Sequence, residues 1–146
     1  QHKRWLDVYK ETAQRWGNKT HVILWRDGWV TRTETEKETA KKLWWPCIRG
    51  DRWFYFSSFP QRAWGGELPQ WLKAIKSEED FTPEHIEPEL VTGTVDEVIE
   101  EIAKYKRELE CDYFIFRCIF GRGPSLEPVV ECLKLFASEV MPHFKD

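Results

Sequence analysis

The stretch Asp112–Phe120, DYFIFRCIF, is the most strand-like part of this 146-residue chain. Its residues are mostly aromatic or β-branched, and it is apolar at odd and even positions alike except for Arg117. A strand that is apolar on both faces is typical of a parallel sheet covered on both sides. Alternation along the strand predicts two faces. One face carries Tyr113, Ile115, Arg117 and Ile119. We expect the other face to pack on helices, and it carries Phe114, Phe116, Cys118 and Phe120.

Helical patterns flank this stretch on both sides. Before it, Leu90-Val91 is a minimal strand, and Thr94 with Glu97 forms a capping box that opens an amphipathic helix. After it, Gly121 to Pro124 is a turn, and we expect Ser125 to cap a final helix that ends near Met141. The final helix should bury its apolar residues Leu126, Val129, Val130, Leu133, Phe136, Ala137 and Val140.

The first 46 residues repeat the alternation of helix and strand. An apolar stripe predicts a helix from His2 to Trp16, and Gly17-Asn18 supplies a left-handed stop. His21 to Trp25 is a short strand, which continues through Arg26-Asp27-Gly28 into Trp29-Val30-Thr31. A second capping box, Thr33 with Glu36, predicts a helix from Glu34 to Trp45 that stops before Pro46.

Residues 47–88 have a looser pattern, with several glycines and prolines between short aromatic pieces. We interpret them as a Trp-rich insertion, with a short helix near Pro69 to Lys76. The chain is then one domain in three parts, 1–46, 47–88 and 89–146, of the α/β class with a parallel sheet. Three strands leave two open edges, so we expect other polypeptide or another copy of the chain to complete the fold.

Composition excludes several classes of function. The net charge is -3 with interspersed signs, which disfavours nucleic acid as a partner, and no apolar run is long enough to cross a membrane. Gln1 does not open a secretory signal, so we expect a cytoplasmic protein or a chain that begins within a longer one. The four cysteines lack metal-site spacing, so we expect buried free thiols and no metal.

Four segments together resemble a known family: RWLDVYKETAQRWG, VILWRDGWVTRTETEKETA, VTGTVDEVIEEIAKYKRELECDYFIFR and SLEPVVECLKLFASEVMPHF. The run Val91 to Val98, the strand ending in Arg117, and the tail Leu135 to Phe144 are similar to the C-terminal part of the luciferase-like monooxygenases. The resemblance covers nearly the whole chain except the insertion.

The resemblance implies the last three strand-helix units of a (β/α)8 TIM barrel with its chemistry at the carboxyl ends of the strands. It also implies reduced FMN with dioxygen, or a deazaflavin hydride carrier, acting on a small organic substrate. A flavin reductase is then a further candidate partner. Catalytic residues would lie mostly outside this chain and stay unknown. The alternative is a non-catalytic half-barrel that binds or assembles through its open sheet edges.

Two arginines and one helix start are the candidate cofactor-binding residues. Arg117, and Arg26 at the end of the first strand, need a carboxylate, a ligand anion or an open barrel mouth, because an unpaired guanidinium in a strand is costly. Gly93 and Thr94 precede a capped helix whose free N–H groups could hold a phosphate, although most such helix starts bind nothing.

Aromatic residues in the insertion are the candidate substrate-binding residues. Trp53, Tyr55 and Trp64 could wall an apolar substrate pocket, or they could pack beneath a loop. No catalytic triad, phosphate-binding Gly-Lys motif or zinc signature is present.

Overall fold

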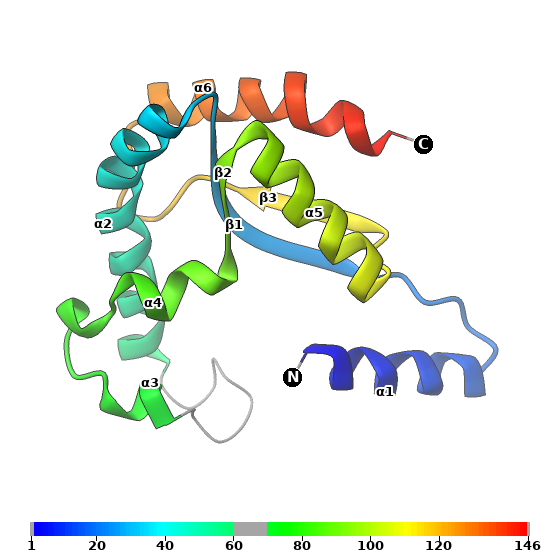
Figure 1. The fold of residues 1–146 in the computed structure, drawn as a ribbon. Helices are drawn as coiled ribbons and strands as arrows, with labels where there is room; N and C mark the ends of the chain where they lie inside the picture. The colour runs from blue at the N-terminus through cyan, green and yellow to red at the C-terminus, as the bar shows by residue number, and fades with distance from the viewer. Residues whose placement is uncertain (1, 60–69, 146) are drawn as a thin grey trace.

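The computed structural model describes residues 2–59 and 70–145. Three strands form one parallel sheet in the order β2-β1-β3 (Figure 1). They are β1 (Ile23–Thr31), β2 (Leu90–Thr94) and β3 (Tyr113–Arg117). The predicted α/β architecture with a parallel sheet is therefore confirmed.

The two outer strands pair with different halves of β1. Strand β3 pairs with Ile23 to Asp27, and β2 pairs with Asp27 to Thr31, so all three strands meet at Asp27. Consecutive strands β2 and β3 lie on opposite sides of β1. In a TIM barrel consecutive strands are neighbours, so the observed order differs from a run of barrel units.

Six α-helices and several short helical turns connect or flank the strands of the described residues. The α-helices are α1 (His2–Arg15), α2 (Glu34–Ser58), α3 (Gln70–Ala74), α4 (Pro83–Ile86), α5 (Val95–Leu109) and α6 (Leu126–Leu135). The other turns are Glu78–Asp80, Glu87–Glu89, Phe136–Val140 and Met141–Phe144. Among the described residues, no helix is long and apolar enough to cross a membrane.

The two faces of the sheet are covered unequally. On one face Phe114 stacks against Tyr105 of α5, and Phe116 stacks against Phe136 with ring centroids 4.2 Å apart. This agrees with the face that the strand alternation assigned to the helices. The opposite face is exposed at Ile23, Trp25, Tyr113 and Ile115.

Gly28 allows the three strands to approach closely at the centre of the sheet. A Cβ atom at this position would lie 2.0 Å from the carbonyl oxygen of Val91 and 2.5 Å from the ring of Phe116. Both distances are far inside van der Waals contact, so only glycine fits.

Helix α2 corrects the predicted stop before Pro46. The helix continues through this proline to Ser58, so residues 47–58 are helical and do not belong to a loose insertion. Proline lacks the N–H that would bond to the fourth preceding carbonyl, but the helix buries Trp44 and Ile48 on either side of Pro46. Burial of this inner face offsets the lost hydrogen bond.

The ends of the chain follow the predicted pattern only in part. Helix α1 forms as expected, and Gly17 follows it with φ of 68°, but its apolar stripe is largely exposed, with Trp16 at 75%. Figure 1 shows α1 set apart from the sheet. Lys10 pairs with Glu110 at 2.7 Å, and the hydroxyl of Tyr9 accepts a bond from the backbone N–H of His21.

The C-terminal helix differs from the expected single α-helix. Helix α6 ends at Leu135 and continues as a π-helical turn, Phe136–Val140, followed by a 3₁₀ turn. Of the expected buried set, Leu126, Leu133 and Ala137 are exposed. Leu126 and Leu133 lie on α6 itself, which buries Val129, Cys132 and Leu135 instead, and Ala137 lies in the π-helical turn. Ser125 stands at the N-cap position, but its side chain makes no capping hydrogen bond.

Candidate functional site

A buried carboxylate lies where the three strands meet. Asp27 of β1 is 4% exposed, and it faces Arg117, its register partner on β3. The Nε and one terminal nitrogen of Arg117 donate to the two oxygens of Asp27 at 2.5 and 2.9 Å. This bidentate arrangement is the strongest geometry for a guanidinium and a carboxylate.

Helix α2 contributes two more charges to this cluster. Asp51 is 6% exposed and accepts from Arg117 at 3.1 Å, and Arg52 donates to Asp27 at 2.9 Å. Two carboxylates thus balance two guanidinium groups. The hydrogen bond to Asp27 is the main reason that the pKa of Arg117 is raised above its ordinary value. The loss of Asp27 would leave the guanidinium groups of Arg52 and Arg117 without the carboxylate that they share.

A cavity of about 280 Å³ opens beside these charges. Its lining is aromatic and charged, and comprises Trp25, Arg26, Asp27, Arg52, Tyr55, Glu89 and Arg117. The lining carries the three guanidinium groups of Arg26, Arg52 and Arg117 and the two carboxylates of Asp27 and Glu89, so its net charge is positive. A positively charged cavity suits an anionic group.

The structure brings three of the predicted site residues together. Arg26, Tyr55 and Arg117 all line this cavity. Arg26 lies within β1 and not at its end, and its guanidinium stands 5.1 Å from the ring centre of Tyr105. Arg117 makes the contact with carboxylates that was one of its expected roles.

The other predicted residues lie elsewhere. Trp53 is half-buried on α2 and packs against Phe56 with ring centroids 6.1 Å apart, and Trp64 lies outside the described residues. Tyr55, although it lines the cavity, is also on α2 and not on a loop.

At the helix start at Gly93 and Thr94, the carboxylate of Glu97 already occupies the position that a bound anion would take. Thr94 forms the predicted capping box, and Glu97 accepts from the backbone N–H of Thr94 at 2.8 Å. Lys37 binds the same carboxylate at 2.8 Å and is the main cause of the lowered pKa of Glu97. A phosphate at this helix start would have to displace Glu97.

The sequence reasoning did not identify Asp27, Asp51, Arg52 or Glu89 as site residues. Asp27 gave a usable signal, because a carboxylate inside an otherwise apolar strand requires a partner. Asp51 and Arg52 gave none, because the interpretation of residues 47–88 as an insertion hid their place on a helix. Their alignment with β1 depends on α2 passing Pro46.

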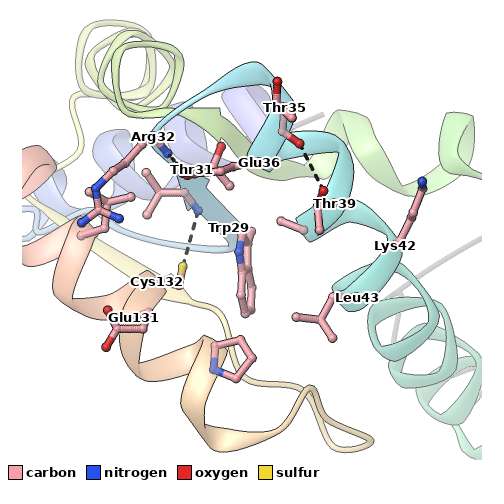
Figure 2. Close-up of a pocket in the computed structure, with 14 residues that line it drawn as sticks. Trp29, Thr31, Arg32, Thr35, Glu36, Thr39, Lys42, Leu43, Glu131 and Cys132 are labelled. Atoms are coloured by element: carbon pink, nitrogen blue, oxygen red, sulfur yellow. Dashed lines mark hydrogen bonds between the residues drawn. The ribbon is translucent and has the colours of Figure 1, made fainter.

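A second hollow lies between the carboxyl end of β1, the start of α2, and α6 (Figure 2). Its volume is about 640 Å³, and Trp29, Leu43 and Leu135 contribute to an apolar wall. The sulfur of Cys132 accepts from the backbone N–H of Val30 at 3.4 Å in this wall.

The cysteines carry no sign of reactivity at this hollow. The neighbouring Cys118 and burial both raise the pKa of the Cys132 thiol, so it stays protonated at neutral pH. All four cysteines are free, as expected, although Cys47 is only half-buried. In residues 2–59 and 70–145, no group of three or more His, Cys, Asp or Glu side chains could hold a metal ion.

Comparisons with known proteins give no further assignment. No model of a known family matches the chain, and no curated protein matches it significantly in sequence.

Proposed function

We propose that this chain is the C-terminal part of a luciferase-like oxidoreductase that acts on a small organic molecule with reduced FMN or a deazaflavin. The family resemblance of residues 91–117 and 125–144 motivates the proposal. The structural observation that carries it is the cavity where Arg26, Arg52 and Arg117 meet Trp25 and Tyr55.

The cavity suits part of such a cofactor or substrate. Small-molecule pockets usually enclose about 300–1,000 Å³. A cavity of about 280 Å³ is too small for a whole flavin nucleotide, but it accommodates an anionic group. Arg26 and Arg52 would hold this anion through their guanidinium groups. The cofactor, when bound, supplies the redox chemistry.

The residues of this chain would orient the bound molecule and exclude water. Trp25 and Tyr55 offer aromatic walls, and Asp27 with Asp51 fixes the guanidinium of Arg117. Because Arg117 is already bonded to two carboxylates, its part is to position the cavity wall.

The proposed site depends on the observed strand order. Here β1 lies between β2 and β3, which places Arg117 beside Asp27, whereas in a (β/α)8 barrel β2 would lie between β1 and β3. The proposal therefore concerns the cavity and does not include the barrel order.

The test is cofactor binding by the complete native polypeptide that contains this chain. We expect reduced FMN or the reduced deazaflavin to bind, and Arg52→Met to raise its Kd about 10- to 100-fold, or about 1.4–2.7 kcal/mol. Arg49→Met is the matched control, because Arg49 lies on the same helix and contacts Glu78 instead. Anaerobic fluorescence titration gives the Kd values.

Two results would count against the proposal in different ways. If neither cofactor binds, the oxidoreductase assignment is wrong. If a cofactor binds and Arg49→Met weakens it as much as Arg52→Met, the cavity is not its anion site.

A second candidate function is a non-catalytic module that assembles through its sheet edges. The observation that favours it is the exposed apolar face at Ile23, Trp25, Tyr113 and Ile115, beside two edge strands. The length of the native polypeptide discriminates the two, because a TIM-barrel enzyme has roughly 250 to 400 residues.

A further inference from the structure

Strand β3 presents an open edge. The backbone N–H of Tyr113 donates to the carbonyl of Val22 at 3.2 Å, on the β1 side. Backbone groups alternate along a parallel strand, so Phe114 and Phe116 point their N–H and C=O groups away from β1. No strand in the described part of the chain pairs with β3 on this side.

The devices that normally protect an edge strand are missing from β3. Natural edges carry lysines, prolines or bulges that prevent pairing with another chain. Residues 113–116 are Tyr-Phe-Ile-Phe, and the one charge in the strand, Arg117, is bonded to Asp27 and Asp51 within the same chain. The edge is therefore apolar, and the strand has no lysine or proline that would prevent pairing with another chain.

Apolar surface continues on both sides of this edge. On the uncovered sheet face, Tyr113 is 63% exposed and Ile115 is 43% exposed. On the helical face, a groove of about 620 Å³ runs between β3, α5 and the C-terminal turns. Phe114, Phe116, Phe136 and Met141 are among its lining residues.

We propose that the β3 edge is a self-association surface that pairs with β3 of a second copy in antiparallel orientation, with Ile115 on the two-fold axis. This inference rests on the assembly function, the second candidate above, and is independent of the flavin site. A two-fold dimer needs a patch that complements itself, and an antiparallel strand pair meets this condition.

The register follows from the outward backbone groups. With Ile115 on the axis, Phe114 lies opposite Phe116 of the partner subunit, so every outward N–H and C=O of the strand finds a partner. Centring the pair on Phe114 or Phe116 would use only part of these groups within the strand. The Ile115 register also places two aromatic rings together on the groove side.

Side-chain charge agrees with the same register. Tyr113 lies opposite Arg117 of the partner subunit, which brings an aromatic ring to a guanidinium. No like charges oppose each other within the strand. The pair joins two three-stranded sheets into one.

A dimer needs contact beyond the strand itself. A stable dimer buries on the order of 1,200–2,000 Å² in total, which is more than a five-residue strand pair supplies. Leu133 and Met141 are exposed beside the groove and, with Tyr113 and Ile115, would extend the contact in each copy of the proposed dimer.

The experiment measures the dimer Kd of the 146-residue chain by sedimentation equilibrium. We expect a dimer at micromolar concentration, and Ile115→Lys should raise its Kd at least about 100-fold, because two ammonium groups would meet on the axis. Ile23→Lys is the matched control, since Ile23 lies on the same exposed face of the central strand β1 and should change the Kd less than about five-fold. Circular dichroism melting checks that both variants fold.

A mixture tests the two-fold position directly. Ile115→Lys mixed with Ile115→Glu should restore dimers, because opposite charges then meet on the axis. The proposal is overturned by a monomeric wild-type chain at tens of micromolar, by assemblies that keep growing with concentration, by equal effects of Ile115→Lys and Ile23→Lys, or by no recovery in the mixture. The outcome of the cofactor titrations does not affect the interpretation of these dimer measurements.

Discussion

The Asp27 carboxylate accepts bonds from Arg117 and Arg52 at once, in a nearly solvent-free position. We expect Asp27→Asn to lower the free energy of unfolding by about 3 kcal/mol, because it leaves two guanidinium groups without their shared partner. Urea unfolding at pH 7 measures this change. The exposed Glu38→Gln on α2 is the control and should change stability by less than about 0.5 kcal/mol. An equally small effect of Asp27→Asn would show that the cluster does not stabilise the fold.

At the scale of an element, the start of α5 gives a pH-dependent prediction. The pKa of Glu97 is lowered chiefly by its bond to Lys37, and further by the N–H of Thr94. A depressed folded-state pKa gives stability that is present above about pH 4.3, the ordinary value, and lost as pH falls through the folded-state pKa. Glu97→Gln should therefore be less stable than wild type at pH 7, and the difference should shrink towards pH 3. Urea unfolding of both proteins at pH 7 and pH 3 measures this difference in the free energy of unfolding. A difference that is the same at both pH values would contradict the proposed link between the Glu97 pKa and stability.

Helix α2 gives a second prediction at this scale. Pro46 removes one helical hydrogen bond, and its ring is exposed, so it adds little burial. We expect Pro46→Ala to raise the free energy of unfolding by about 1–2 kcal/mol, since an internal proline costs about 3 kcal/mol and part is relaxed by local bending. Thermal unfolding of the variant measures the gain. A loss of stability would mean that Pro46 helps to align Asp51 and Arg52 with Asp27.

For the whole molecule, we expect the 146-residue chain alone to bind no flavin and to show no oxidoreductase turnover. Its cavity encloses about 280 Å³ and offers only the anion-binding part of a cofactor site. Absorbance after gel filtration with FMN measures binding. Stoichiometric yellow chromophore on the isolated chain would contradict the expectation.

The sequence by itself determined two helix starts and the type of sheet. The N-cap at Thr33, the capping box at Thr94 and the strands that are apolar on both faces are local signals, so these helix starts and the parallel α/β class followed from them. Arg117 was also recognisable, because a charge within an apolar strand requires a partner wherever the strand lies.

Only the tertiary structure decided which residues meet. Pro46 signals a helix end locally, but burial of Trp44 and Ile48 against the body of the protein carries α2 onward and brings Asp51 and Arg52 to β1. The order β2-β1-β3 likewise depends on contacts between residues far apart in the chain, to which a local pattern is blind. The charge cluster and the open edge of β3 both result from this long-range packing.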